Sequence, residues 1–224
     1  MSLGERRTAL LAGASGLVGR ELLRLIAAEP RYERVHNLVR RPASGAASSS
    51  KVSELVVSFD ALPALPRVDD VYIALGTTIK VAGSQEAFRR VDFDYVVAVA
   101  RAARDAGASR LGVVSALGAD AGSRVFYNRV KGEMQDAVFS LGYESVVIAQ
   151  PSLLVGDREA LGQPARVGER WAQRLLTPMS ALIPASFRPV PARDVAAILV
   201  ARVLVTERGN VIVPSREMLG AASD

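Results

Sequence analysis

Short apolar runs alternate with helical stretches along this chain, and this alternation constrains the fold more than any other feature of the sequence. The apolar runs are Thr8–Ala12, Val35–Val39, Leu55–Ser58, Val71–Leu75, Leu111–Val114, Ser145–Ala149 and Asn210–Val213. Strands that are apolar on both faces form parallel sheets that helices cover on both sides. The sequence therefore predicts an α/β fold built on a doubly wound parallel sheet.

Helical apolar spacing fills the intervals between these runs. The expected helices are Leu17–Ala28, Gln85–Ala106, Ser123–Leu141 and Val195–Val205. Residues 152–190 break the rhythm, because they are rich in proline and hold the single tryptophan. A chain of 224 residues is long enough for one well-formed core. We therefore expect one domain over residues 1–224, in which residues 152–190 form a small substrate-covering segment.

The scarcity of soft metal ligands excludes several kinds of site. The chain has no cysteine and one histidine, His36, so disulfides, zinc–cysteine sites and histidine-rich metal sites are excluded. His36 lies in a strand-like run, and no nucleophile elbow occurs elsewhere, which argues against a Ser-His-Asp hydrolase. We expect no metal site.

The formal charge of +5 comes from arginines that are spread over the whole chain, and only 5% of the residues are aromatic. Nucleic-acid binding favours clustered positive charge with aromatic side chains for base stacking, so a polyanionic small molecule is the better partner. No apolar run is long enough to cross a bilayer. We therefore predict a cytoplasmic protein, monomer or homodimer, with a small-molecule substrate and no nucleic-acid or membrane partner.

Three glycines follow the first expected strand and open the first expected helix, in the segment Gly13–Gly19 (GASGLVG). The first glycine permits a tight turn, Gly16 lets the backbone approach a pyrophosphate, and Gly19 lets the helix pack closely on the strand. Free N–H groups at the helix start bind phosphate. The motif lies in the strand–turn–helix context that it requires, so we predict a Rossmann dinucleotide site. Its expected contacts are Gly13, Ser15, Gly16, Leu17, Val18 and Gly19.

Arg40 and Arg41 end the second expected strand, where an NAD-specific site normally presents an acidic residue. No acidic residue stands there. The two guanidinium groups can hold the 2′-phosphate of NADP through charge-assisted hydrogen bonds, although paired arginines also occur elsewhere in the chain. We predict NADP as the cofactor.

Two further segments are candidates for the cofactor trench. Asp60 follows the third expected strand, and it either accepts a hydrogen bond from the adenine amino group or caps the turn before Pro63. Leu75, Gly76 and Thr77 end the fourth strand. A glycine there keeps the floor of the trench open and lets the backbone follow the ribose; the alternative is a plain strand-end turn.

Lysine is rare here, since only Lys51, Lys80 and Lys131 stand among 28 basic residues. Tyr127 precedes Lys131 by four residues, which on a helix places the phenol and the ammonium on one face. The ammonium is a compact point charge that favours the phenolate. Tyr127 is therefore a candidate proton donor or acceptor near neutral pH.

Ser115 closes the fifth expected strand, shortly before this pair. In a doubly wound sheet the end of a central strand and the start of the next helix converge on the ligand crevice. We predict that Ser115 orients a carbonyl or alcohol oxygen, Tyr127 exchanges a proton with it, and Lys131 holds the nicotinamide ribose. Taken alone, Ser115 is equally compatible with a turn or helix-cap serine.

Together these motifs resemble an atypical short-chain dehydrogenase/reductase, and more closely the Tat-interacting protein family of NADPH-binding oxidoreductase-like proteins. The matching segments are residues 13–19, 39–41, 74–78 (ALGTT), 88–96 (FRRVDFDYV), 127–133 (YNRVKGE) and 156–159 (GDRE). The resemblance implies NADP(H) contacts at Ser15 to Val18, Arg40, Arg41, Leu75, Gly76, Tyr127, Lys131 and Arg158.

Two positions depart from the pattern of the wider superfamily. Asp92 stands roughly where many reductases place a catalytic asparagine, and since a carboxylate would handle a proton relay differently, Asp92 is left out of the catalytic set. Gln150-Pro151-Ser152 stands where relatives often carry Arg-Pro-Gly, which affects the shape expected near the nicotinamide.

The sequence thus predicts an NADP(H)-dependent oxidoreductase that acts on a carbonyl or alcohol, with Ser115, Tyr127 and Lys131 as catalytic residues. A second hypothesis is an NADPH-binding sensor or protein-interaction module without turnover, because fold and cofactor site do not guarantee chemistry. The intact Ser–Tyr–Lys set argues against it. A third, a sugar-nucleotide epimerase or dehydratase, needs a larger substrate domain than the last sixty or so residues provide.

Overall fold

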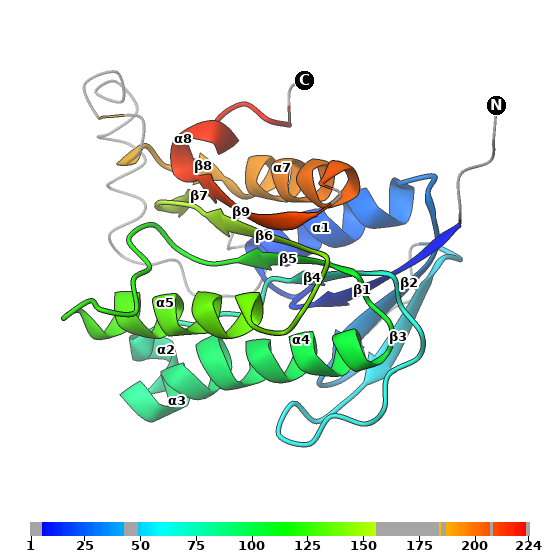
Figure 1. Cartoon of the computed structure of the whole chain (residues 1–224), viewed down its shortest axis with the longest axis horizontal. Coiled ribbons are helices and arrows are strands. Elements are labelled where there is room, and N and C mark those ends of the chain that lie inside the picture. Colours follow the sequence, from blue (N-terminus) through cyan, green and yellow to red (C-terminus); the bar gives the residue numbers. More distant parts are fainter. Residues whose placement is uncertain (1–5, 43–48, 156–183, 185–186, 207, 223–224) are drawn as a thin grey trace.

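The computed structural model describes residues 6–42, 49–155, 184, 187–206 and 208–222. Seven strands form one sheet in the order β3-β2-β1-β4-β5-β6-β9, and every neighbouring pair is parallel (Figure 1). The strands are β1 (Arg7–Ala12), β2 (Tyr32–Val39), β3 (Val52–Val56), β4 (Asp70–Ile73), β5 (Arg110–Val114), β6 (Ser145–Gln150) and β9 (Gly209–Pro214). The predicted doubly wound α/β fold is confirmed. The strand order reverses between β1 and β4, which places the ligand crevice at the carboxyl ends of these strands.

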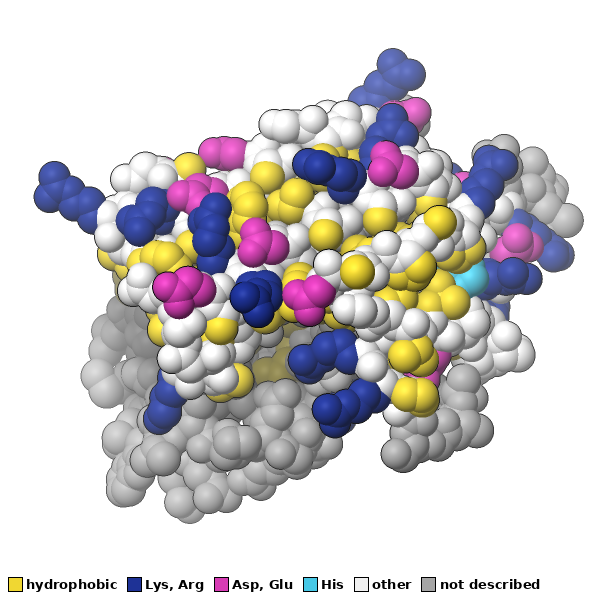
Figure 2. Space-filling model, turned by 90° about the horizontal axis from the view of Figure 1, so that it is seen from below, with side chains coloured by type: hydrophobic (Ala, Val, Ile, Leu, Met, Phe, Trp, Pro, Cys, Tyr) yellow, Lys and Arg dark blue, Asp and Glu magenta, His cyan; other side chains and the backbone are white. Residues whose placement is uncertain are grey.

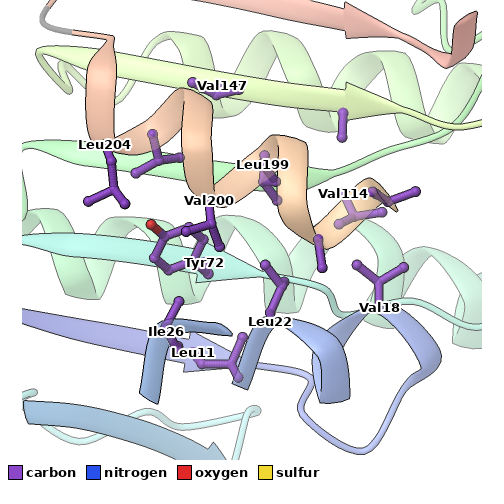
Figure 3. Close-up of a cluster of buried hydrophobic side chains, with 14 of the residues drawn as sticks. Leu11, Val18, Leu22, Ile26, Tyr72, Val114, Val147, Leu199, Val200 and Leu204 are labelled. Atoms are coloured by element: carbon purple, nitrogen blue, oxygen red, sulfur yellow. The ribbon is translucent and has the colours of Figure 1, made fainter. Parts of the chain in front are cut away.

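Helices cover both faces of the sheet. On one face lie α1 (Leu17–Ala28) and α7 (Ala192–Val205), and on the other lie α4 (Tyr95–Asp105) and α5 (Phe126–Phe139) (Figure 1). The buried cluster of Figure 3 fills the space between α1, α7 and the sheet. Gly112 on β5 makes this close packing possible, because a Cβ there would lie 2.8 Å from Val203 of α7.

The predicted helix Gln85–Ala106 is interrupted in the structure. It consists of α3 (Gln85–Arg89), a π-helical turn η1 (Arg90–Asp94) and α4. The wider turn carries Asp92, whose side chain is buried. Single π-turns inside α-helices are frequent at functional sites, and this one lies by the carboxyl end of β4, where the Asp92 carboxylate accepts a hydrogen bond from the Thr77 N–H.

Other boundaries differ more modestly. Strand β3 begins three residues before the expected Leu55, since it is an edge strand that pairs with β2 and alternates in exposure. Helix α5 begins at Phe126 rather than Ser123, because the Ser123 hydroxyl accepts a hydrogen bond from the Val125 N–H (3.1 Å) and holds a turn there. Among the described residues, four short elements were not predicted: α2 (Ile79–Ala82), β7 (Leu154–Val155), β8 (Val190–Pro191) and α8 (Ser215–Met218).

The segment expected over residues 152–190 is described only at its two ends. There β7 and β8 pair in parallel as a separate two-stranded sheet. The Ser152 hydroxyl donates to the Arg188 carbonyl oxygen (2.5 Å). The substrate-covering role stays a prediction, because residues 156–183 lie outside the described part of the chain.

A polar network joins the amino ends of β1, β2 and β4, at the edge of the sheet opposite the crevice. The Arg7 guanidinium donates twice to the Asp70 carboxylate (2.7 and 2.6 Å). The Tyr32 hydroxyl lies 2.9 Å from the same carboxylate and 2.7 Å from the Tyr72 hydroxyl. Burial raises the pKa of Tyr32 far above its usual range, and the neighbouring Tyr72 and Asp70 reinforce the shift. Both phenols are therefore neutral partners that fix this edge.

The surface seen in Figure 2 mixes charge types. Basic and acidic side chains are interspersed there with hydrophobic ones, so this face carries no continuous basic stripe. No helix in the described part of the chain combines the length and apolar composition that crossing a bilayer requires.

Candidate active site

Two of the three glycines in the loop after β1 are required by the fold itself. Gly13 has φ +103°, and a Cβ there would lie 2.6 Å from the backbone of Ala74 at the end of β4. A Cβ on Gly19 would lie 1.9 Å from the Gly13 carbonyl oxygen. These contacts seat the loop against the end of β4 and bring α1 close to β1, as the motif predicts.

The middle glycine has a different environment. Gly16 has φ −86° and ψ 169°, which any residue can adopt, and a Cβ there would meet only the Gly13 and Ala74 carbonyl oxygens, at 3.4 and 3.9 Å. Neither backbone strain nor a severe clash within the described residues requires glycine at this position. Close approach of an external group is the remaining reason for a residue without a side chain.

Helix α1 begins after this glycine without a side-chain cap, as α5 and α7 also do. Gly16 is its N-cap, and no side chain caps the first turn. By contrast, the hydroxyls of Thr78 and Ser84 accept hydrogen bonds at the N-termini of α2 and α3. The first N–H groups of a helix carry partial positive charge and bind anions. The loop and this helix start therefore fit the diphosphate of a dinucleotide.

Arg40 and Arg41 follow β2 directly, and both side chains are exposed. Strand β2 neighbours β1, so its carboxyl end lies beside the glycine loop. Residues 39–42 contain no acidic side chain. This arrangement fits a phosphate group on the adenosine ribose, and the preference for NADP stays a prediction.

Asp60 has a partner that the sequence did not indicate. Its carboxylate accepts a hydrogen bond from the Tyr95 hydroxyl (2.7 Å), and the Tyr95 ring packs against Phe59 with ring centres 5.6 Å apart. This hydrogen bond raises the pKa of Tyr95, because ionising the phenol would place two negative charges together. Contact of Asp60 with adenine stays a prediction.

A buried ion pair lies at the carboxyl end of β4. The Lys131 ammonium is 2.7 Å from one oxygen of the Asp92 carboxylate, and the side chains are 4% and 1% exposed. The other carboxylate oxygen accepts a hydrogen bond from the Thr77 backbone N–H (2.8 Å). A Cβ on Gly76 would lie 3.3 Å from Asp92 and 4.0 Å from the ammonium. The predicted segment Leu75–Thr77 therefore lies against Lys131.

Asp92 is thus a site residue that the sequence analysis set aside. It holds the ammonium of Lys131 directly and the chain after β4 through Thr77. A buried charge needs a partner of opposite sign and further hydrogen bonds. Asp92 is the partner of the Lys131 ammonium, and the Thr77 N–H gives Asp92 a further hydrogen bond. A signal was present in the sequence, since Asp92 stands roughly where many reductases of the wider superfamily place a catalytic asparagine.

Ser115 lies just beyond the end of β5 and is 6% exposed. Its hydroxyl oxygen accepts a hydrogen bond from the Gln135 side-chain amide (2.6 Å). The Gln135 amide oxygen in turn accepts from the Gln150 amide (3.1 Å). Gln135 was not predicted as a site residue, although it follows Lys131 by the same interval that separates Lys131 from Tyr127.

Tyr127, Lys131 and Gln135, spaced by four residues, form one stripe on α5. Tyr127 is half-buried, and its ring lies 5.4 Å from that of the buried Phe88. No hydrogen bond to its hydroxyl occurs within the described residues. Gly132 lets the loop after β5 approach α5, because a Cβ there would lie 2.1 Å from the Ala121 nitrogen. This α5 stripe brings Lys131 and Gln135 to the strand ends, and Tyr127 lies against Phe88 of α3.

The predicted groups follow one another along the carboxyl edge in the order of the strands. The arginine pair lies at β2, the glycine loop at β1, the segment 75–77 with Lys131 at β4, and Ser115 at β5. Arg158 lies outside the described residues, so its predicted contact is not placed. Within the described part of the chain, no three metal-ligating side chains gather.

Comparison with known proteins decides the family. Residues 13–146 match a family of NAD(P)H-binding proteins. The chain belongs to this NAD(P)H-binding family. This match and the Rossmann fold agree with the resemblance to an atypical short-chain dehydrogenase/reductase that the sequence motifs predicted.

Relatives of the family occur in fungi. The chain is 33% identical over 186 residues to protein FMP52, mitochondrial, of Candida albicans, a match that covers 76% of this chain and 81% of the relative. It is 38% identical over 154 residues to the protein of the same name in Eremothecium gossypii, which covers 67% and 68%. The prediction of a cytoplasmic protein is contradicted, because these relatives are named as mitochondrial. Amino-acid composition informs on redox chemistry and solubility, but it does not indicate the compartment in which a protein is found.

Solved structures share the fold. An oxidoreductase of the short-chain dehydrogenase/reductase family from Burkholderia thailandensis superposes with a TM-score of 0.68 at 21% identity, covering 98% of this chain and 94% of that one. MoeE5 in complex with UDP-glucose and NAD superposes with the same TM-score at 17% identity, covering 96% and 81%. Both likenesses concern the Rossmann architecture of the family.

Proposed function

We propose that this family member is an NADP(H)-dependent oxidoreductase that reduces a carbonyl, or oxidises the matching alcohol, on a small organic molecule. The α5 stripe is the observation that supports this most. Lys131 contacts Asp92 beside the end of β4, Gln135 contacts Ser115 at the end of β5, and Tyr127 lies one turn nearer the start of the helix. A proton donor, a cation and an oxygen-orienting hydroxyl thus share the edge that carries the glycine loop.

Each residue of the set has a distinct role in this proposal. When bound, the nicotinamide cofactor supplies or accepts the hydride. Ser115 orients the substrate oxygen, and in the reduction direction the Tyr127 phenol donates its proton to that oxygen. Lys131 holds the nicotinamide ribose, and Asp92 fixes the ammonium in place.

The catalytic part of the proposal is tested by Tyr127→Phe. NADPH consumption is followed over a panel of aldehydes, ketones and quinones. The variant should lose at least about a hundredfold in kcat, because general acid catalysis contributes that much, while NADPH affinity stays close to wild type. A fully active Phe variant contradicts the role of the tyrosine. A wild-type protein that binds NADPH but consumes none with any carbonyl would instead favour the sensor or interaction hypothesis.

The cofactor preference is tested at the end of β2. Replacing both Arg40 and Arg41 by alanine should weaken NADPH binding by at least about tenfold and leave NADH binding unchanged, because charge-assisted bonds to a phosphate are lost. Arg24→Ala is the matched control, since Arg24 is an exposed arginine on α1 that pairs with Glu21. Affinities are measured by fluorescence titration. Wild-type protein that binds NADH as tightly as NADPH would contradict the preference.

A further inference from the structure

The buried surroundings of Ser115 specify more than its position. Gln135 is 4% exposed, and its amide nitrogen donates to the Ser115 hydroxyl oxygen over 2.6 Å. Its amide oxygen is also used, because the Gln150 amide donates to it over 3.1 Å. Three side chains from β6, α5 and the end of β5 therefore form one directed chain of hydrogen bonds.

The direction of this chain is that of its two hydrogen bonds, in which Gln150 donates to the Gln135 oxygen and Gln135 donates to Ser115. An amide has a donor end and an acceptor end, so a donor from Gln150 at the oxygen of Gln135 turns the nitrogen toward Ser115. A hydroxyl that accepts from an amide keeps its own O–H hydrogen for another acceptor. Within the described residues, no hydrogen bond uses the hydroxyl hydrogen of Ser115.

We infer that Gln135 is a positioning residue for Ser115, and that Gln150 orients the Gln135 amide, so that the Ser115 hydroxyl meets the substrate oxygen as a hydrogen-bond donor. This inference rests on the proposed oxidoreductase function. It assigns a task to Gln150, which stands where the sequence departs from the Arg-Pro-Gly pattern of similar proteins. Gln150 acts through Gln135 and touches no reacting atom.

The first test needs neither substrate nor cofactor. Side-chain amide signals of uniformly 15N-labelled protein are assigned by comparison with Gln135→Leu and Gln150→Leu. In Ser115→Ala, one amide proton of Gln135 should exchange with solvent about tenfold faster, which corresponds to the loss of a hydrogen bond of about 1.4 kcal/mol. Unchanged exchange of the Gln135 amide would overturn the inference.

The second test measures coupling between the residues. With NADPH and menadione as substrates, Gln135→Leu should lower kcat by about tenfold at an unchanged KM for NADPH. In a Ser115→Ala background the same substitution should add nothing, because Gln135 acts only through the serine. Losses that multiply in the double variant would assign Gln135 a merely structural role and overturn the inference.

The third test reverses the direction of the chain. Gln150→Glu presents only acceptor oxygens, so the Gln135 amide must turn its nitrogen to residue 150 and its oxygen to Ser115, which then captures the hydroxyl hydrogen. The kcat of Gln150→Glu should fall at least as far as that of Gln135→Leu, whereas Gln150→Leu, which removes the donor without reversal, should fall less. Equal kcat values for Gln150→Glu and wild type would overturn the inference.

If wild-type protein reduces neither menadione nor the other carbonyls, the proposed function fails, and the exchange measurement still decides the hydrogen-bond chain.

Discussion

The glycines of the loop after β1 serve different purposes, since two of them are needed for folding and the third is free to serve ligand binding. Gly13 and Gly19 are required by contacts inside the protein, whereas Gly16 has an ordinary backbone conformation and room for a side chain. The sequence motif predicted a separate reason for each of the three glycines. The distances to the Ala74 and Gly13 backbones support the turn and packing reasons for Gly13 and Gly19, whereas the approach of a pyrophosphate to Gly16 stays a prediction.

Gly16→Ser should therefore leave the fold intact and abolish cofactor binding. Serine is a good N-cap, so the free energy of unfolding should stay within about 1 kcal/mol of wild type or rise. Its side chain fills the space that a phosphate needs and occupies the free N–H groups, so NADPH affinity should fall at least about a hundredfold. Denaturant unfolding and fluorescence titration measure the two quantities.

Gly19→Ala is the control with the opposite profile. Its Cβ would lie 1.9 Å from the Gly13 carbonyl oxygen, and overpacking of this kind costs about 1–3 kcal/mol or more. A Gly16→Ser variant that binds NADPH like wild type would show that the loop does not approach the diphosphate.

The ion pair of Asp92 and Lys131 is a second residue-scale feature with a measurable consequence. Asp92→Asn keeps an acceptor for Thr77 but leaves the buried ammonium without a counter-ion, and Lys131→Met leaves a buried carboxylate. Each should lower the free energy of unfolding by about 3–5 kcal/mol. The double variant should recover part of this loss, since no unpaired charge remains. Urea unfolding of the four proteins gives the coupling, and strictly additive losses would argue against a direct pair.

At the scale of elements, helix α5 shows which parts of the site a sequence can indicate. Tyr127 and Lys131 were recognisable because lysine is rare in this chain. Gln135 continues the same spacing, yet glutamine is an ordinary residue for an exposed helix face, so nothing marked it. The π-turn was equally hidden, because the sequence from 85 to 106 has continuous helical character and the tertiary contact of Asp92 with Lys131 accompanies the wider turn.

The contact of α5 with the loop after β5 predicts an element-scale effect. Gly132→Ala places a Cβ 2.1 Å from the Ala121 nitrogen, so the helix must shift away from the loop. Stability should fall by about 1–3 kcal/mol, and kcat should fall even where the variant is fully folded, because Tyr127 and Ser115 lie on opposite sides of this contact. Gly122→Ala in the same loop, where the added Cβ would make only ordinary contacts of 3.5 Å or more with the Asp120 carboxylate, should leave kcat unchanged. Wild-type kcat in Gly132→Ala would contradict this account of the contact.

Across the whole molecule, His36 provides a defined pH dependence, since it is the single histidine of the chain. Its ring nitrogen lies 2.8 Å from the Ser53 hydroxyl and links β2 to the edge strand β3. Burial lowers the pKa of His36, and the nearby Arg34 reinforces the shift. The folded state therefore binds this proton less readily than the unfolded state, whose value is about 6.5.

The stability that depends on neutral His36 is complete above about pH 6.5 and declines as the pH falls toward the lowered folded value. The free energy of unfolding of wild type should thus decrease between about pH 7 and pH 5. His36→Gln should flatten the curve over that interval. Parallel curves for the two proteins would show that other groups cause the pH dependence.

Layer order and strand alternation were predictable at this scale because a buried parallel sheet needs continuous apolar runs on both faces. The polar network of Arg7, Asp70, Tyr32 and Tyr72 was not, since its members are distant in sequence and each is unremarkable alone. That network fixes the amino ends of β1, β2 and β4 through internal partners. Substitutions at the opposite, carboxyl edge of the sheet can therefore change which small molecule is bound, while the hydrogen bonds that hold the amino ends of these strands stay the same.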